Sequence, residues 1–382
     1  MHGDRRACPS DGGVSVLSGD PRVVLTLDAG GTKFTFNAMR SGRLLLEPLT
    51  LPSRADDLDA CLEQVRAGFD AVHAATGKNA AAISFAFPGP ADYPAGVIGD
   101  LGNLPAFRGG VALGPMLQDR YGIPVFLNND GDLFTYGEAL AGFLPWVNEQ
   151  LAQAGSARRH RNLIGFTVGT GLGAGVVHDG RLLLGDNSAA GEVWSLRHRD
   201  VRDAFAEEGA SIRAVRREYA QRTGIPLDAG PQPREIAAIA RGESPGDAQA
   251  AGEAFRRLGE VLGDAIAQAL AIIDGLVVIG GGMSEAIPLF MPALVAELNG
   301  LLRTVDGKTV ARLELTAFDL DDPRGRKEFL RQGGREVAVP GSTRKALYQP
   351  DKRTGVGRSR LGTSAAISLG AYAFALSRLE TP

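Results

Sequence analysis

The sequence has few cysteines, few aromatic residues and no long apolar run. Cys8 and Cys61 are the only cysteines among its 382 residues, which excludes a disulfide scaffold and a cysteine-rich zinc site. It contains no stretch of 18 consecutive apolar residues, so we expect no membrane span. The N-terminal residues MHGDRRACPSDGG lack the apolar segment of a secretory signal. We therefore expect a cytoplasmic protein.

Net charge is also small. The 44 acidic side chains outnumber the 41 basic ones by three, which argues against bulk attraction to nucleic acid or to an anionic membrane. Aromatic residues make up only 6% of the chain, too few for a nucleic-acid binder that stacks bases. The histidines are scattered without the spacing of metal ligands, at positions 2, 73, 160, 178 and 198. We expect neither nucleic acid nor membrane as a partner.

Glycine, in contrast, is abundant: 51 of 382 residues, where ~7% is usual. The glycines gather at the ends of short apolar segments that are typical of strands. A strand, a glycine turn and a second strand occur over residues 22–39 and again over 163–177. Apolar residues at helical spacing over 58–75 predict a helix, and helices dominate 203–271. The pattern predicts an α/β protein in two similar halves.

The two glycine turns are suited to binding phosphate. In the first, DAGGTK at residues 28–33, no side chain obstructs the N–H groups of the two glycines. Asp28 is suited to hold a water bound to Mg²⁺, and Lys33 to neutralise phosphate charge. The second turn, at 169–175, offers similar donors, and a third glycine run at 280–282 follows a buried strand. The alternative is that the glycines serve only hairpin geometry. Neither turn has the P-loop or the Rossmann pattern.

Three carboxylates are candidates for chemistry. Asp130 follows Asn129 between a predicted strand and a predicted helix, where it would act as a general base toward a hydroxyl or would belong to a helix N-cap. Glu192 and Glu207 lie in loop sequences. Loop carboxylates accept hydrogen bonds from vicinal sugar hydroxyls, and the alternative is a solvated surface position. The residues alone do not decide between base and helix cap for Asp130, or between sugar contact and surface position for the two glutamates.

A basic segment occurs in this mildly acidic chain. Residues 321–360 contain 11 Lys or Arg and 5 Asp or Glu, a local charge of +6. We interpret the segment as a solvated loop or a subunit interface. The alternative is a basic rim that steers a polyanionic nucleotide or a phosphorylated ligand.

Taken together, these segments resemble the ROK family of sugar kinases, within the actin-like, hexokinase-like ATPase superfamily. LDAGGTK at 27–33 and GTGLGAG at 169–175 are similar to the family's two phosphate loops, and VVIGGGMSEA at 277–286 to its adenosine-binding segment. NDGDLFTYGE at 129–138 matches the block N-D-x-N-x-x-x-x-G-E, except that Asp132 replaces the second Asn. FPGPAD at 87–92 and the segment Asn103-Leu-Pro105 resemble its sugar-side loops.

The resemblance implies ATP-dependent phosphorylation of a hexose or a hexose derivative, with ATP and Mg²⁺ as cofactors. It also implies a homodimer, and two similar actin-like (ribonuclease H-like) α/β domains with a cleft between them. Asp130 is the implied catalytic base. The implied sugar contacts are Gly89, Asn103, Asn129, Glu192 and Glu207. The implied nucleotide contacts are Asp28, which holds Mg²⁺ through water, Gly30, Gly31, Thr32, Lys33, Thr170, Gly171, Gly281 and Gly282.

The chain length suggests about two domains. We expect a disordered tail over residues 1–20 and a small N-terminal α/β domain over 21–128 that the C-terminal helix 361–380 completes. We expect a large C-terminal α/β domain over 129–360.

The sequence departs from the family near the implied sugar pocket. The family pattern G-E-x-G-H precedes a cysteine-rich zinc loop, whereas here Ser195 stands in place of the histidine and residues 197–205 contain no cysteine. The later E-x-x-A-S pattern persists at 207–211. We therefore expect a member without zinc, in which His198 is a candidate replacement for the histidine. A polar insert at 144–162 is a further difference.

Other functions stay open. One is a sugar-responsive repressor, although we expect no room for its helix-turn-helix domain before Asp28. Another is an actin-like ATPase that hydrolyses ATP without sugar, and a third is a kinase that uses another donor such as polyphosphate. The sequence does not identify the sugar, because sugars that differ in one hydroxyl are separated by single hydrogen bonds.

Overall fold

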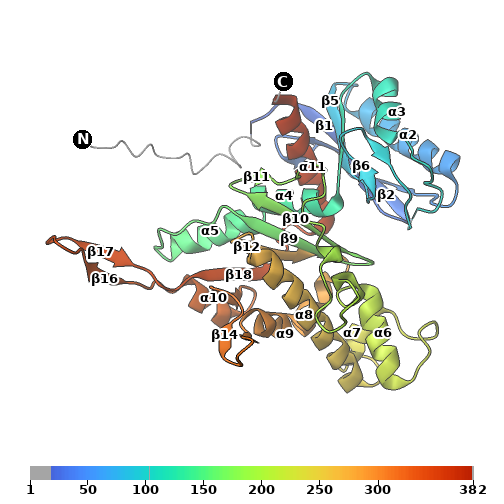
Figure 1. The fold of residues 1–382 in the computed structure, drawn as a ribbon. Helices are drawn as coiled ribbons and strands as arrows, with labels where there is room; N and C mark the ends of the chain where they lie inside the picture. The colour runs from blue at the N-terminus through green and yellow to red at the C-terminus, as the bar shows by residue number, and fades with distance from the viewer. Residues whose placement is uncertain (1–18, 103, 381–382) are drawn as a thin grey trace. The chain divides into compact units, whose positions relative to one another are not determined.

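The computed structural model describes residues 19–102 and 104–380 (Figure 1). The chain divides into two compact units. Unit 1 contains the residues up to Ala141 and those from Ser364 onward, and unit 2 is Gly142–Thr363. Each unit has its own sheet and its own hydrophobic core. Over the described ranges, no helix combines the length and the apolar character that crossing a membrane requires.

The sheet of unit 1 has the strand order β3-β2-β1-β5-β8, and β4 also pairs with β2. β1 and β2 are antiparallel, whereas β1, β5 and β8 are parallel. The strands are β1 (Val23–Ala29), β2 (Lys33–Arg40), β3 (Arg43–Leu44), β4 (Leu49–Pro52), β5 (Ala80–Ala86), β8 (Val125–Asn128) and the small pair β6 (Ala91–Asp92) and β7 (Val97–Ile98). The helices are α2 (Leu58–Ala75), α3 (Leu113–Tyr121), α4 (Asp130–Ala141) and α11 (Thr363–Glu380).

Helix α2 forms where its apolar spacing predicts it. Asp57 caps its start by accepting a hydrogen bond from the N–H of Ala60 at 3.0 Å. Its buried face contains Val65 and Phe69, and the Phe69 ring meets the Phe36 ring of β2 edge-on at 5.1 Å. This face of α2 therefore closes the core on one side of the sheet.

Helices α4 and α11 approach each other at backbone distance. A Cβ on Gly137 of α4 would lie 2.1 Å from the carbonyl oxygen of Ala366, and one on Gly370 of α11 would lie 1.9 Å from that of Leu133. This close packing joins α4 to unit 1. The two units consequently divide after Ala141, and not after residue 128 as we expected, because the sequence does not reveal which helix α4 packs against.

The sheet of unit 2 repeats the same arrangement, with the order β11-β10-β9-β12-β18-β15. β9, β10 and β11 form antiparallel pairs, and β9, β12, β18 and β15 are parallel. The strands are β9 (Leu163–Val168), β10 (Leu172–His178), β11 (Arg181–Leu182), β12 (Leu276–Gly280), β15 (Thr316–Asp319) and β18 (Arg353–Arg358). The predicted fold of two similar α/β domains is confirmed.

The remaining elements of unit 2 are helices and two hairpins. The helices are α5 (Phe143–Gln153), α6 (Ile212–Thr223), α7 (Pro233–Ala240), α8 (Ala248–Leu270), α9 (Ile287–Leu298) and α10 (Pro323–Leu330), with short 3₁₀ turns η1 (Val193–Ser195), η2 (Ala206–Glu208) and η3 (Ser284–Ala286). The hairpins are β13 (Leu301–Arg303) with β14 (Thr309–Ala311), and β16 (Arg335–Ala338) with β17 (Lys345–Tyr348).

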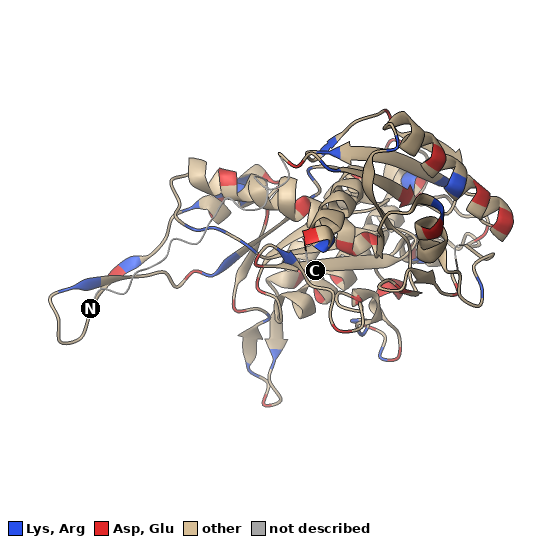
Figure 2. Cartoon of the chain, turned by 90° about the horizontal axis from the view of Figure 1, so that it is seen from above, with Lys and Arg blue, Asp and Glu red and all other residues tan. Residues whose placement is uncertain are grey.

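The basic segment 321–360 is not one solvated loop. It forms α10, the β16–β17 hairpin and the buried strand β18. Arg353 of β18 is buried and donates to the carbonyl oxygens of Glu328 and Arg331 at 2.8 and 2.6 Å. Within this segment, only the β16–β17 hairpin has solvent-exposed strands, and each contains one basic residue, Arg335 or Lys345 (Figure 2). The interpretation as an interface or a steering rim stays a prediction for that hairpin.

The tail expected over residues 1–20 falls mostly on residues 1–18, which lie outside the described ranges. Asp20 is held by two neighbours: its carboxylate accepts a hydrogen bond from Arg22 Nε at 3.0 Å, and its carbonyl oxygen accepts one from Ser41 Oγ at 2.9 Å.

The insert 144–162 packs against α10 through a histidine. The His160 ring stacks on Phe329 with 5.7 Å between ring centres, and its buried Nε2 has no hydrogen-bond partner. Burial, reinforced by nearby Arg158 and opposed by Asp274, lowers the pKa of His160 to about 4. The folded protein therefore holds this ring neutral at pH values where a free histidine is charged.

We expect His160→Phe to reduce the acid sensitivity of folding. In the unfolded chain His160 gains its proton near pH 6.5, whereas in the folded chain it does so only near its lowered pKa. The wild type therefore loses free energy of unfolding as the pH falls between these values, by about 2 kcal/mol at pH 4.5 from this group. Urea unfolding at pH 7 and 4.5 measures the loss. The exposed His178 supplies the control variant His178→Phe. The prediction fails if His160→Phe keeps the wild-type pH dependence or if His178→Phe reduces it equally.

Candidate active site

The candidate residues of unit 1 gather at one edge of its sheet. Asp28 of β1 is paired in register with Ala86 of β5, which is paired with Asn128 of β8. The carboxyl ends of these parallel strands thus lie side by side, the edge at which open α/β sheets bind ligands. Three candidate segments begin at this edge. They are the turn 28–33, the loop 87–92 and the pair Asn129-Asp130.

The first glycine turn is held from outside by Ser53. Gly30 closes the turn by donating its N–H to the Lys33 carbonyl oxygen at 3.0 Å. Ser53 donates its hydroxyl to Gly31 O at 2.6 Å and its N–H to Thr32 O at 3.1 Å. The side chains of Thr32 and Lys33 are exposed. Sequence reasoning missed Ser53, because it follows β4, a strand that pairs with β2.

Asp28 presents a single carboxylate beside this turn. Its Oδ2 accepts a hydrogen bond from Ser364 Oγ at 2.6 Å. One carboxylate beside a phosphate-sized turn fits Mg²⁺, which keeps most of its waters and takes its other ligands from phosphate oxygens. Among residues 19–102 and 104–380, no three or more His, Cys, Asp or Glu side chains gather as a metal-binding group.

Asn129 and Asp130 cap helix α4. The N–H of Gly131 donates to Asn129 Oδ1 at 2.8 Å and to Asp130 Oδ1 at 2.9 Å. The contacts of both side chains fit the capping alternative. The role of Asp130 as a general base stays a prediction.

Tyr93 links Asn129 to the loop that contains Gly89. Its hydroxyl donates to the Phe87 carbonyl oxygen at 3.0 Å and lies 3.3 Å from Asn129 Nδ2. A Cβ on Gly89 would lie 3.3 Å from the same hydroxyl. Two predicted sugar contacts are thus brought together by a residue that sequence reasoning missed. Asn103, a further predicted sugar contact, lies outside the described ranges.

In unit 2 the second glycine turn lies beside the third glycine run. Gly280 is paired in register with Thr167, and the N–H of Met283 donates to Val168 O at 3.0 Å. Gly281 has a φ of +92°, and a Cβ there would lie 2.5 Å from Val168 O. Glycine is required at 281 for this close approach. Two of the predicted nucleotide segments, including Gly281 and Gly282, are therefore neighbours.

Glu207 contacts the second glycine turn. Its Oε2 accepts the N–H of Leu172 at 3.0 Å, and its Oε1 accepts from Arg213 at 2.8 Å. A Cβ on Gly171 would lie 2.7 Å from Oε2, so the glycine makes room for the carboxylate. Glu207 therefore packs against the 169–175 turn, which contains Thr170. The role of Glu207 as a sugar contact stays a prediction.

Glu192 is exposed and lies in a tight turn. Its carboxylate accepts a hydrogen bond from the indole N–H of Trp194, and its carbonyl oxygen accepts one from Ser195 Oγ at 2.8 Å. The Trp194 ring meets the Phe205 ring edge-on at 5.6 Å. Ser195, which stands where the family has histidine, uses its hydroxyl to close this turn.

Ion pairs hold the loop that contains zinc ligands in the family. His198 Nδ1 accepts the N–H groups of Asp200 and Val201 at 3.0 and 3.2 Å. Arg199 pairs with Glu260 of α8 at 3.0 Å, and Arg257 of α8 pairs with Asp200 at 2.7 Å. Burial lowers the pKa of His198, which suits a ring nitrogen that accepts hydrogen bonds. His198 is thus engaged within its own loop.

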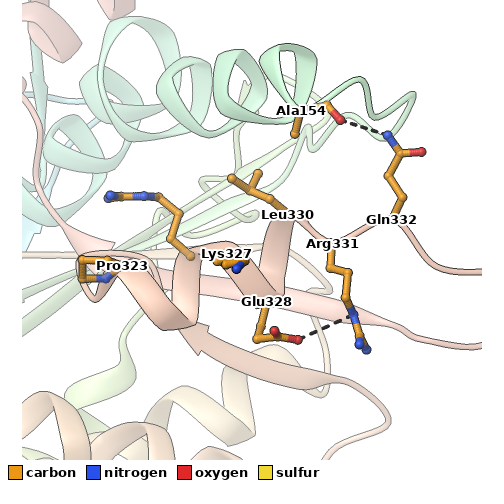
Figure 3. A pocket seen from close by; sticks show the side chains of 8 residues that line it. Ala154, Pro323, Lys327, Glu328, Leu330, Arg331 and Gln332 are labelled. Atoms are coloured by element: carbon orange, nitrogen blue, oxygen red, sulfur yellow. Dashed lines mark hydrogen bonds and ion pairs between the residues drawn. The ribbon is translucent and has the colours of Figure 1, made fainter.

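A hollow of about 480 Å³ lies elsewhere in unit 2, beside α10 (Figure 3). Gln332 donates to Ala154 O at 2.9 Å across it, and Arg331 pairs with Glu328 at 3.5 Å. Its lining is Ala154, Pro323, Arg326, Lys327, Glu328, Leu330, Arg331 and Gln332. None of the predicted site residues lines it, so it is not the candidate active site.

Comparison with known proteins identifies the family. The sequence profile of the ROK family matches residues 24–325. A crystal structure of glucokinase from Parabacteroides distasonis is 51% identical with a TM-score of 0.82, and the match covers 94% of this chain and 99% of that one. The N-acetyl-D-glucosamine kinase of Vibrio vulnificus strain YJ016 is 30% identical over 173 residues, 44% of this chain and 51% of that enzyme. The chain thus spans about half the length of this curated relative.

The fold also occurs in a ROK family transcriptional regulator, a homolog of the E. coli MLC protein. That structure is 20% identical with a TM-score of 0.64, and the match covers 93% of this chain and 78% of that one. At this identity the likeness concerns the fold alone. With about four fifths of its length inside the family profile, the chain belongs to the ROK family.

Proposed function

We propose that this protein is an ATP-dependent sugar kinase that phosphorylates a hexose or a hexose derivative. The observation that carries the proposal is the shared sheet edge of Asp28 and Asp130. A glycine turn suited to phosphate follows β1, and a carboxylate suited to accept a hydroxyl proton follows β8, two strands away in the same parallel array. The identity to a glucokinase over nearly the whole chain supports the same reaction.

In the proposed reaction Asp130 accepts the proton of a sugar hydroxyl while the hydroxyl oxygen attacks the γ-phosphorus of ATP. The bond between the γ-phosphorus and the bridging oxygen breaks, and ADP leaves. The N–H groups that the glycine turns do not use internally, such as that of Gly31, and the Lys33 ammonium group stabilise the charge that develops on the phosphoryl oxygens. When bound, Mg²⁺ neutralises phosphate charge, and Asp28 is the residue that would hold it through water.

The predicted sugar contacts enter this proposal unequally. Asn129 has the best-defined place, because Tyr93 and the helix cap both hold its side chain. Glu192 is exposed, and Trp194 already donates to its carboxylate. Gly89 and Glu207 complete the proposed set with Asn103. That the enzyme is a homodimer in the cytoplasm stays a prediction.

A coupled assay of ADP release tests the proposal. We would supply MgATP with a panel of hexoses, hexosamines and N-acetylhexosamines, without added zinc. We expect turnover with one or two of these sugars and a baseline rate with the rest. Equal ADP release with and without every sugar would instead favour an actin-like ATPase. No release with any sugar would favour the sugar-responsive regulator or another phosphoryl donor.

A further inference from the structure

Helix α11 presents three hydroxyl groups on one face. Ser364, Ser368 and Tyr372 follow one another at intervals of four residues, which places them above one another along the helix. Ser364 Oγ donates to Asp28 Oδ2 at 2.6 Å, Ser368 Oγ accepts from Asn37 Nδ2 at 3.3 Å, and the Tyr372 hydroxyl oxygen accepts the N–H of Ser41 at 2.9 Å. The polar face of α11 is therefore hydrogen-bonded along the β1–β2 hairpin, whose turn is the first glycine turn.

We propose that Ser364 is a positioning residue for Asp28. A carboxylate can rotate about its Cβ–Cγ bond, which would leave the direction of its oxygens undefined. The Ser364 hydroxyl holds Oδ2, and this single contact also fixes the direction of Oδ1. The Asp28 carboxylate is then held in one orientation beside the turn. The inference rests on the proposed function, because it assigns Ser364 a role toward the carboxylate that would hold Mg²⁺ through water.

The position of Ser364 is itself fixed by packing. The residues of α11 that follow, from Ala366 to Leu376, are buried. The close backbone contacts at Gly137 and Gly370 prevent α11 from sliding along α4. The preceding residue, Thr363, accepts the N–H of Gly281 at 2.9 Å in unit 2. Thr363 is the last residue of unit 2, and unit 1 resumes at Ser364. Each of these two residues contacts a predicted nucleotide segment of its own unit. Ser364 itself is exposed, so replacing it removes a hydroxyl without opening the core.

The test compares Ser364→Ala with the matched variant Ser368→Ala. Both remove one hydroxyl from the same face of α11, but only Ser364 touches Asp28. We expect Ser364→Ala to raise the Mg²⁺ concentration for half-maximal activity about tenfold, the lower range for losing a partner of a metal-holding group. We expect calorimetry to show the same loss in ADP affinity measured with Mg²⁺, and no loss without Mg²⁺. Ser364→Thr keeps the hydroxyl and should restore both.

The control separates positioning from general stability. We expect Ser368→Ala to lower the unfolding temperature while leaving the Mg²⁺ dependence of ADP binding unchanged. The inference is overturned if Ser364→Ala keeps the wild-type Mg²⁺ dependence, if Ser368→Ala shifts it equally, or if the wild type binds ADP no more tightly with Mg²⁺. Failure of the proposed function is a different result: the wild type would then phosphorylate no sugar, while the calorimetric comparison would still decide the role of Ser364.

Discussion

Replacing Asp130 with asparagine is expected to lower kcat at least about 100-fold, the lower range for removing a general base. Asparagine has nearly the same shape, and its Oδ1 can still accept the N–H of Gly131 that caps α4. What it cannot do is take a proton from a sugar hydroxyl. We therefore expect the affinity for sugar and the unfolding temperature to change little while turnover collapses.

The measurement combines kcat with the best sugar of the panel, calorimetric sugar binding and a thermal melt. Asp119→Asn is the matched control, because it removes an exposed carboxylate from α3 in the same unit. That variant should retain the wild-type rate. Turnover of Asp130→Asn within a few-fold of the wild type would show that the proton goes elsewhere, and the residue would then be only a helix cap.

Gly370→Ala is expected to destabilise the fold by about 3 kcal/mol or more, at the upper end for overpacking. The added Cβ would lie 1.9 Å from the carbonyl oxygen of Leu133. That oxygen belongs to the backbone of α4, so α4 and α11 would have to separate to admit it. Because α4 begins at Asp130 and α11 contains Ser364, separation would also displace both ends of the proposed site of unit 1.

A second glycine provides the control for this prediction. Gly252 lies inside α8, and a Cβ added to it would have no atom within 4 Å. Gly252→Ala should therefore raise stability by up to about 1 kcal/mol through helix propensity alone. Urea unfolding of both variants measures the contrast. Equal stability of Gly370→Ala and the wild type would mean that the two helices do not pack at backbone distance in solution.

The site residues differ in how far local sequence could reveal them. Asp28, Asp130 and the glycine turns follow predicted strands directly, and the motif order was sufficient to find them. Ser53, Tyr93 and Ser364 carry no local signal, since each acts on a partner from another segment: Gly31, Asn129 and Asp28 respectively. Local sequence indicated Glu207 as a candidate but gave no sign of its contact with Leu172, because η2 and the second turn meet only in the folded chain.

Local sequence was sufficient to predict helix α2, the strands beside the glycine turns and the repeat of those turns, because apolar periodicity and glycine act over a few residues. The order of the motifs along the chain was likewise sufficient to indicate the family. The folded chain was needed to show that α4 packs with α11, that ion pairs hold the loop around His198, and that helix α11 touches Asp28. These depend on contacts between residues up to 336 positions apart, and a local pattern contains no information about which distant side chain will fill a given space.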